Sequence, residues 1–365
     1  MITSKVSVVL PCFNIENRVQ HLIEGVCSVL NQTHPPAELL VIDDGSSDNS
    51  GFLIDEHIRP LVEPLLQFRQ IRLKENSGVS VARNRGIAEA KSEYIAFIDF
   101  DDLWFPQYLE SIVRALNADA TRQLILAKTI FWSKRNGLTK ARVQEFPDDI
   151  NEWSELALID YCMRNNFPVA MGSAVACRKE VFSRKPELLF DEFLSRETAE
   201  DVHFGFKFLA ANLKPYFLSK PVVVHRTFLT RSVSRSQGAR LFKDELITYD
   251  YIMKTVCEAL IERIANERFD SLASMLALQA EIRTKFLFKS NLLHRRLLAL
   301  ISQLISRPKL SKDLIQVLAG KYFGKTDLAL NLAFNRGSSS PEICESVDRL
   351  IANLNKPKAA YLLDR

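Results

Sequence analysis

Two stretches in which an apolar run ends abruptly in acids constrain this chain more than any other feature. The first is VIDDGSSDNS at residues 41–50, and the second is FIDFDDLW at residues 97–104. Such a run is typical of a buried parallel strand, whose carboxyl end lies at the sheet edge where α/β folds bind ligands. Asp99, Asp101 and Asp102 repel one another unless a cation or a hydrogen-bonding ligand holds them. The sequence therefore predicts a binding site at this edge.

Strand and helix patterns alternate along the first part of the chain. Strands are expected at residues 6–10, 39–42, 71–73 and 94–98, and helices at 17–30 and 79–90. This alternation implies right-handed βαβ units. Further strands are expected at 124–131, 174–177 and 222–225, with a helix near 200–211. We therefore predict an α/β fold with a Rossmann-like, mostly parallel central sheet flanked by helices.

The chain is predicted to have two parts. Its 365 residues and 47% apolar content suffice for one large domain and a smaller one. Beyond about residue 241 the pattern is only helical. We expect an α/β domain at residues 1–238 and an α-helical C-terminal region at 239–365, which packs on the domain, contacts a partner or lies on a membrane surface. Oligomer formation through its apolar faces stays open.

The cysteines and apolar runs indicate a cytoplasmic protein. The six cysteines form no CxxC pair, which favours reduced, packed thiols over disulfides or a zinc site. The start MITSKVSVVLPC lacks the apolar core and cleavage site of a signal peptide. No run reaches the ~18–20 apolar residues that a membrane-spanning helix needs.

Positive charge is concentrated in one segment, residues 283–325. It holds ten Lys or Arg residues and one acid, Asp313, whereas the whole chain has a net charge of +4. Its apolar residues share one helix face, namely Leu293, Leu297, Leu300, Ile301 and Leu304. Such a helix could lie peripherally on the inner face of the cytoplasmic membrane, or pack on the protein with its charges in water. We expect no nucleic-acid binding, because interleaved aromatic platforms are missing.

Five segments, in order and at suitable spacing, resemble the family-two glycosyltransferases, which have the GT-A fold. They are VSVVLPCFNIEN (6–17), SVLNQTHPPAELLVIDDGSSDNS (28–50), NSGVSVARNRGI (76–87), YIAFIDFDDLW (94–104) and AEDVHFGFKFL (199–209). The resemblance covers roughly residues 5–235. It implies a metal-dependent, inverting enzyme that moves a sugar from a nucleoside-diphosphate sugar to a hydroxyl of a glycan or glycolipid. Surface polysaccharide or lipopolysaccharide synthesis is the expected setting.

The resemblance assigns Asp99 and Asp101 to a DxD motif. Oxygen ligands suit Mn²⁺ or Mg²⁺, which would neutralise charge on the leaving diphosphate. Asp101 is expected to be the principal metal ligand, with Asp99 on the ribose or in the metal's outer shell. His225 is a third candidate ligand, although its spacing from Ser232 departs from the family pattern, and a packed or surface histidine is the alternative. The alternative for the acids is a set of helix N-caps.

The nucleotide is expected to bind at the ends of the early strands. The implied residues are Pro11, Phe13, Asn14, Glu16, Asp43, Asp44, Arg83, Asp99 and Phe100. An aspartate at the second strand's end can accept the imide N–H of uracil or thymine, or an N–H of guanine, but cannot pair with the unprotonated N3 of cytosine. A UDP-sugar is weakly preferred over thymidine or guanosine donors. For Asp44 the alternative is an Asx turn, and for Arg83 it is a solvated surface charge.

Glu200 and Asp201 match the acidic pair that supplies the general base in this family. Asp201 is expected to remove the proton of the acceptor hydroxyl, with Glu200 orienting the acceptor or the base. The alternative is an acid pair favoured by a helix N-terminus. Gly172 and Ser173 are expected to line the acceptor side, where small residues leave room for a sugar. Trp104, Trp132 and Trp153 are either packed or sugar platforms.

Two other functions remain open at this point. The same fold could serve as a non-catalytic module that binds nucleotide sugars or glycans, although the retained Asp101 and Asp201 argue against it. A nucleotidyltransferase or phosphotransferase usually has a glycine-rich phosphate loop such as GxxxxGK[ST], and the chain has none.

Overall fold

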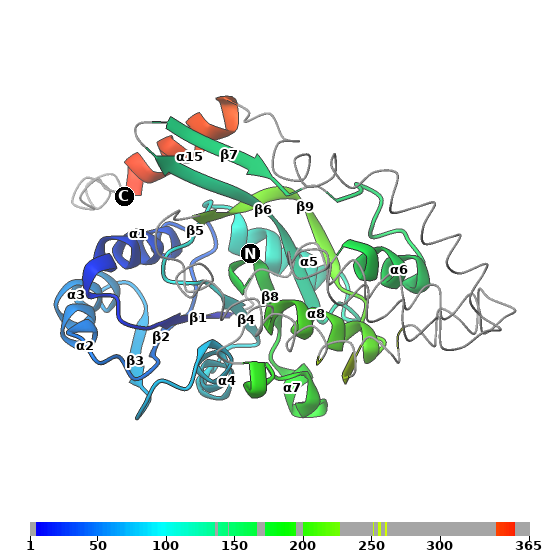
Figure 1. The fold of residues 1–365 in the computed structure, drawn as a ribbon, viewed down its shortest axis with the longest axis horizontal. Coiled ribbons are helices and arrows are strands. Elements are labelled where there is room, and N and C mark those ends of the chain that lie inside the picture. Colours follow the sequence, from blue (N-terminus) through cyan, green and yellow to red (C-terminus); the bar gives the residue numbers. More distant parts are fainter. Residues whose placement is uncertain are drawn as a thin grey trace, which may run out of the picture.

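The structure, a computed structural model, describes residues 5–135, 138–144, 146–165, 172–194, 200–226, 251, 255–256, 260 and 341–354. In this part of the chain nine strands form one sheet in the order β3-β2-β1-β4-β8-β6-β9-β5, with β7 paired to β6. The strands are β1 (Val6–Cys12), β2 (Glu38–Asp43), β3 (Gln67–Arg72), β4 (Tyr94–Phe97), β5 (Leu103–Trp104), β6 (Leu124–Arg135), β7 (Leu138–Val143), β8 (Val175–Arg178) and β9 (Tyr216–Arg226). Helices cover both faces (Figure 1).

The first four strands build the parallel half of the sheet. β1 pairs in parallel with both β2 and β4, and β3 extends the sheet beyond β2. The connections are α1 (Val19–Leu30), the helical run of α2 (Ser50–Leu53) and α3 (Arg59–Val62), and α4 (Val79–Glu89). Strand order therefore reverses between β1 and β4, and ligands in open α/β sheets bind at the carboxyl ends beside such a switch point.

The second half of the sheet is mixed. β8 lies antiparallel to β4, β6 antiparallel to β8, and β9 parallel to β6. β5 pairs antiparallel with β9, which brings the residues just after the acidic turn 99–102 next to the end of β9. The predicted α/β fold with a Rossmann-like central sheet flanked by helices is confirmed, and the antiparallel pairings are confined to the second half of the sheet. β7, which forms an antiparallel hairpin with β6, is not among the strands expected from the sequence.

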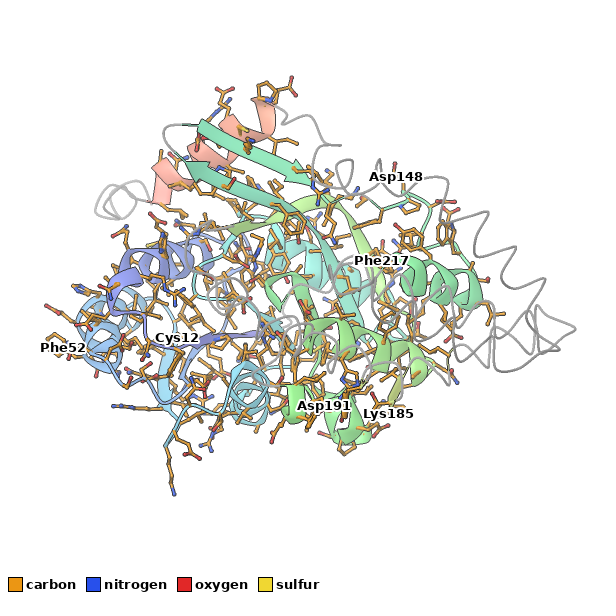
Figure 2. All side chains as sticks on the ribbon, viewed as in Figure 1. Cys12, Phe52, Asp148, Lys185, Asp191 and Phe217 are labelled. Carbon is orange, nitrogen blue, oxygen red and sulfur yellow. The ribbon has the colours of Figure 1, made fainter. Side chains whose placement is uncertain are left out.

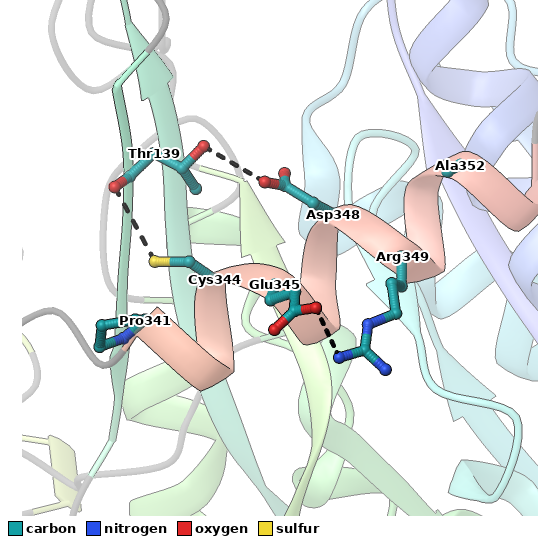
Figure 3. Close-up of a pocket in the computed structure, with 7 residues that line it drawn as sticks. All are labelled: Thr139, Pro341, Cys344, Glu345, Asp348, Arg349 and Ala352. Carbon is teal, nitrogen blue, oxygen red and sulfur yellow. Dashed lines mark hydrogen bonds and ion pairs between the residues drawn. The ribbon is translucent and has the colours of Figure 1, made fainter.

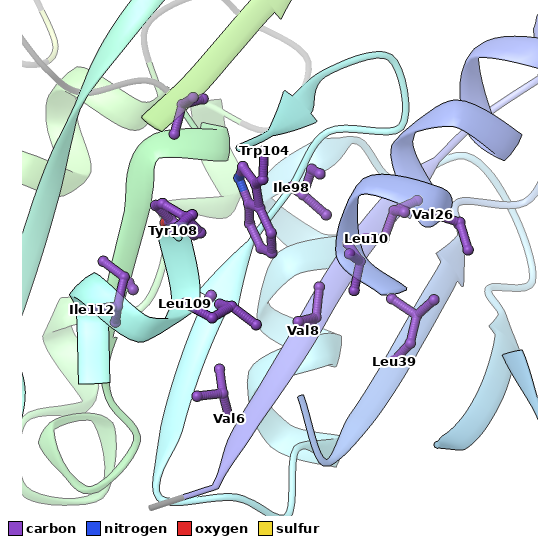
Figure 4. Close-up of a cluster of buried hydrophobic side chains, with 14 of the residues drawn as sticks. Val6, Val8, Leu10, Val26, Leu39, Ile98, Trp104, Tyr108, Leu109 and Ile112 are labelled. Atoms are coloured by element: carbon purple, nitrogen blue, oxygen red, sulfur yellow. The ribbon is translucent and has the colours of Figure 1, made fainter. Parts of the chain in front are cut away.

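Two apolar clusters hold the sheet between its helices. Alternate residues of β1 point to opposite faces, so Val9 joins one cluster while Val6, Val8 and Leu10 join the other. Figure 4 shows the second cluster, in which α1 and α5 (Tyr108–Ala118) pack on the strands. On the opposite face lie α4, α6 (Glu155–Asn165), α7 (Glu180–Arg184) and α8 (Glu200–Ala210). Trp104 and Trp132 are buried, so both pack in the protein as the simpler interpretation expected.

The last described helix, α15 (Pro341–Leu354), runs beside β7 (Figure 1). Val347, Leu350 and Leu354 pack in a third apolar cluster with residues of α1, β6 and β9. The predicted boundary at 238/239 and the basic segment 283–325 lie outside the described residues, so both stay predictions. Within the described ranges no helix has the length and apolar character to span a membrane.

Candidate active site

Asp102, which is fully buried, fixes the acidic turn 99–102 that follows β4. Its carboxylate accepts hydrogen bonds from Ser173 Oγ (2.5 Å) and from the backbone N of Arg226 (3.1 Å). His225 Nδ1 lies 3.1 Å from Asp102 Oδ1. Burial opposes ionisation, but His225 and these donors hold the pKa of Asp102 below its ordinary value. Asp102 therefore anchors the turn and orients His225.

A buried arginine joins the turn to the acidic pair of α8. Arg83 Nη2 donates to Asp99 Oδ1 and its Nη1 donates to Glu200 Oε1, both at 2.8 Å. The Arg83 side chain is 2% exposed, so these are strong, poorly screened contacts. We call Arg83, Asp99 and Glu200 the Arg83 clamp. The clamp brings together Asp99, after the end of β4, and Glu200, at the start of α8, as the sequence predicted. Arg83 was expected to reach the nucleotide, and in the structure it contacts these two acids.

Gly172 is required by the close approach of the clamp. A Cβ built on Gly172 would lie 2.1 Å from Arg83 Nη2 and 3.2 Å from Asp99 Oδ1. Its neighbour Ser173 also supports the turn, because its Oγ accepts from the backbone N of Asp99 at 2.9 Å. Both residues were predicted to line the acceptor side. The structure places them directly behind the acidic turn, and their role toward an acceptor stays a prediction.

Asp201 lies beside the clamp at the first turn of α8 and is partly buried. Its Oδ1 accepts a hydrogen bond from the backbone N of Val202 at 2.8 Å. Burial and then the Glu200 carboxylate raise the pKa of Asp201 to about 8, although Arg83 acts in the opposite direction. A carboxylate with a raised pKa is a stronger base than an ordinary one, which suits proton removal near neutral pH.

The two acids at the end of β2 have different partners. Asp44 accepts from the backbone N of Ser77 (2.8 Å) and of Gly78 (2.7 Å), so it holds the loop before α4. Asp43 Oδ1 accepts from the backbone N of Ser46 at 2.9 Å. Its Oδ2 is buried without a hydrogen bond among the described residues, and Arg72 Nε lies 3.6 Å away. Asp43 is therefore the acid with an unused acceptor.

Polar residues in the loop after β1 form hydrogen bonds with the loop after β2. Asn14, at φ +47°, accepts from the backbone N of Ser47 at 2.9 Å, and Glu16 accepts from Asn49 Nδ2 at 2.6 Å. The β1 end, which carries Cys12 in Figure 2, and the β2 end thus form one rigid edge. Pro11 lies within β1, and Phe13 is partly buried. A nucleotide role for these residues stays a prediction.

Asp101 is the acid of the turn with the weakest contacts. Among the described residues its carboxylate has one ion-pair partner, Arg18 Nη1 at 3.9 Å, and Arg18 also lies over the Phe100 ring. Burial and then the Asp102 and Asp99 carboxylates raise the pKa of Asp101 above its ordinary value. A bound cation would relieve this repulsion, so the donor chemistry at Asp101 fits a divalent metal.

The other candidate ligands are already engaged. Asp99 accepts a hydrogen bond from Arg83. Burial alone would lower the pKa of His225, but the Asp102 carboxylate outweighs this effect and raises that pKa to about 9. A metal would therefore have to displace the proton of His225. No three His, Cys, Asp or Glu side chains of the described ranges converge in a metal-binding arrangement. The observed donors fit a cation held mainly through Asp101.

Arg226, for which the sequence left open a loop over the diphosphate or a solvated charge, fastens the turn to α1. Its Nη1 donates to Glu24, its Nε donates to the backbone O of Asp101, and its Nη2 donates to the backbone O of His21 at 3.0 Å. Arg226 is 4% exposed.

Comparisons with known proteins show which family the chain resembles over most of the described α/β part. The model of the family described as "Glycosyl transferase family 2" matches residues 7–185. The poly(ribitol-phosphate) beta-N-acetylglucosaminyltransferase TarP of Staphylococcus aureus (strain N315) is 34% identical over 260 residues, which cover 69% of this chain and 73% of TarP. An uncharacterized glycosyltransferase of Rickettsia felis is 41% identical over 109 residues, which cover 29% of this chain but 16% of that protein.

A solved structure shares the fold. The crystal structure of S. aureus TarS 1-349 in complex with UDP-GlcNAc superimposes with a TM-score of 0.52 at 18% identity, covering 77% of this chain and 72% of that one. At this identity the likeness establishes the architecture of the sheet and its helices.

Proposed function

Because this chain belongs to glycosyl transferase family 2, we propose that it is an enzyme that transfers a sugar from a nucleoside-diphosphate sugar to a hydroxyl of a glycan or glycolipid acceptor. The Arg83 clamp carries this proposal. It joins Asp99, at the switch point of the sheet, to Glu200, beside the proposed base Asp201. A donor and an acceptor bound at this edge would meet between these two acidic segments.

The proposed reaction is an inverting displacement with Asp201 as general base. Asp201 takes the proton of the acceptor hydroxyl while that oxygen attacks the anomeric carbon. The bond from the anomeric carbon to the diphosphate oxygen breaks, and its electron pair leaves with the nucleoside diphosphate. Glu200 is held by Arg83 and so fixes the start of α8 on which Asp201 lies. The described residues offer no second acid at the clamp that is better placed as a base.

Asp101 would hold Mn²⁺ or Mg²⁺, and Asp99 and His225 would join it only by exchanging their contacts with Arg83 and Asp102. When bound, such an ion acts as a Lewis acid that stabilises charge on the leaving diphosphate. Asp43 supports recognition of the base, because its buried Oδ2 can accept an imide N–H. This acceptor favours uracil over cytosine.

The similarity to TarP supports UDP-GlcNAc as the first donor to test and a cell-wall or surface polymer as the acceptor. The protein is incubated with Mn²⁺ and a panel of nucleotide sugars, and released nucleoside diphosphate is measured. Asp201→Asn is expected to lower turnover and preserve donor binding, whereas Asp101→Ala is expected to weaken donor binding and abolish the metal dependence. Asp148→Asn, at an exposed position, is the matched control.

A binding module of the same fold is the competing function. Asp201, which is partly buried beside Glu200 and has a raised pKa, favours the enzyme, because a module that only binds needs no such base. Absence of nucleoside diphosphate release with every donor, including in the presence of candidate acceptors, would favour the binding module.

A further inference from the structure

The segment 189–194, which precedes α8, is fastened to two helices. Asn84 of α4 accepts from the backbone N of Phe190 and donates to its backbone O, both at 2.9 Å. Lys207 of α8 donates to the backbone O of Leu189. The segment therefore cannot move without disturbing α4, which carries Arg83, or α8, which carries Glu200.

Phe190 transmits the position of this segment to the clamp. Its ring stacks on Phe204 of α8, with centroids 4.0 Å apart and an interplanar angle of 10°. Arg83 Cζ lies 5.2 Å from the centroid of the same ring, and Phe97 of β4 packs against it edge-on at 5.4 Å. One aromatic ring thus contacts the guanidinium of the clamp, the helix of the acidic pair and the strand that leads to Asp99.

The third attachment of the segment comes from the C-terminal region. Tyr251 OH donates to Asp191 Oδ2 at 2.8 Å, and the Tyr251 ring stacks on Phe193 at 4.6 Å. Asp191 lies on the side of the molecule where α4 and α7 pack (Figure 2). Val256 and Leu260 are buried in the same apolar cluster as Phe204.

The two oxygens of the Asp191 carboxylate have different donors: Oδ1 accepts from the backbone N of Phe193 at 3.0 Å, and Oδ2 depends on Tyr251. Thr255 Oγ1 donates to the backbone O of Tyr251, so it accepts from His203 Nε2, 3.1 Å away. This tautomer leaves no proton on His203 Nδ1, which lies 3.8 Å from Asp191 Oδ2. Tyr251 is then the donor to that oxygen within the described ranges. Burial and then the Asp191 carboxylate raise the pKa of Tyr251 to about 12, so its hydroxyl keeps its proton.

We propose that Tyr251 is a positioning residue for sugar transfer, through which the C-terminal region holds segment 189–194 and hence the Arg83 clamp in place. The inference rests on the proposed function of the acidic pair. Tyr251 does not contact the edge formed by β1 and β2, and the segment that it holds packs on α8, which carries Glu200 and Asp201, so its main effect is expected on the transfer step. The C-terminal region becomes a part of the catalytic apparatus.

The test is Tyr251→Phe, which keeps the ring and its stacking and removes the hydroxyl. We expect kcat to fall roughly tenfold, as for loss of one hydrogen bond to a charged group, with KM for the donor within about twofold of its original value. Tyr216→Phe is the matched control, because the Tyr216 hydroxyl makes no hydrogen bond within the described ranges. An unchanged kcat, or a fall that appears only as a higher KM, would overturn the proposal.

A second measurement does not depend on catalysis. Hydrogen–deuterium exchange at the amides of residues 200–206 is expected to be several-fold faster in Tyr251→Phe than in the unchanged protein and in Tyr216→Phe, because local opening exposes the helix. If the unchanged protein turns over no nucleotide sugar, the proposed function is contradicted. The hydrogen–deuterium exchange measurement still tests whether Tyr251 holds segment 189–194 in place. Equal exchange in all three proteins would overturn the positioning role.

Discussion

At Arg83, a single buried guanidinium separates two carboxylates that would otherwise repel each other. Asp99 and Glu200 come from sequence positions far apart, and each receives one Arg83 hydrogen bond of 2.8 Å. Because the guanidinium has a rigid, planar fork of donors, it fixes the direction of both carboxylates as well as their charge. Lysine, with a single ammonium, cannot reproduce both contacts. The arrangement therefore predicts a large effect of small changes at residue 83.

Arg83→Met is expected to lower the free energy of unfolding by about 2–4 kcal/mol, because two partly buried carboxylates lose their counter-charge. Urea denaturation measures the change. Arg85→Met, two positions along the same helix, is the control, because Arg85 is half exposed and pairs with Glu89 alone among the described residues. Equal stability of the two variants would show that the clamp contributes nothing to the fold.

The pH dependence of activity is also expected to follow from a single residue. Asp201, with a pKa raised to about 8, is protonated below that pH, so kcat/KM is expected to rise about tenfold per pH unit up to about pH 8 and then level off. Glu200 raises this pKa, so Glu200→Gln is expected to move the acidic limb to lower pH. Glu180→Gln, at a half-exposed position on α7, should leave the profile unchanged. A profile that is flat from pH 6 to 9 would contradict Asp201 as the base.

The residues of the site could be predicted from motifs, but their partners could not. The motif NSGVSVARNRGI marked Arg83, and the structure keeps it at the site, facing acids separated from it by 16 and 117 positions. Asp44 receives the amides of Ser77 and Gly78, which the motif does not reveal, while its predicted place near the nucleobase stays a prediction. Pairing between distant segments depends on strand register and side-chain packing, which a single sequence does not reveal.

Among the elements, strand ends were predicted best where both faces of the strand are buried. β1 and β2 are buried at every position, so their apolar runs stand out in the sequence. β3 lies at the sheet edge and reads QFRQIR, with one fully buried residue, Phe68, which explains why only its last part was expected. β7 escaped notice for a similar reason, because its cover, α15, comes from far along the chain.

The element α8 carries a pH-dependent stability of its own. Burial lowers the pKa of His203 to about 4 from an ordinary 6.5, with Lys207 lowering it and Asp191 opposing. The stabilisation by neutral His203 is fully present above pH 6.5 and is lost as the pH falls toward 4. Between pH 7 and pH 5 the loss is about 2 kcal/mol.

Urea denaturation at both pH values checks this loss in the unchanged protein and in His203→Gln. The variant is expected to lack this part of the pH dependence. His57→Gln is the control, because His57 lies at the surface beside Glu56. If the His203 variant keeps the full pH dependence, the acid sensitivity arises elsewhere.

On the scale of the whole molecule, α15 closes the outer side of the sheet although it lies near the end of the chain. Val347, Leu350 and Leu354 pack with Cys27 of α1, Trp132 of β6 and Val224 of β9 in one apolar cluster. A hollow of about 630 Å³ opens between α15 and Thr139 of β7 (Figure 3). Thr139 and Cys344 are linked there by a sulfur contact of 3.8 Å, so the helix and the hairpin touch by polar as well as apolar groups.

This packing makes α15 part of the folded catalytic unit, which leads to a test of the whole molecule. Val224 directly precedes His225 and Arg226, so the cluster that holds α15 also supports the strand end that fastens the acidic turn. Leu350→Ala is expected to lower the free energy of unfolding by about 2–4 kcal/mol in a single transition, since it leaves a cavity in that cluster. Arg349→Ala, on the exposed face, is the control. A separate early transition in Leu350→Ala, with the main one unshifted, would show that α15 folds apart from the sheet and does not support the turn.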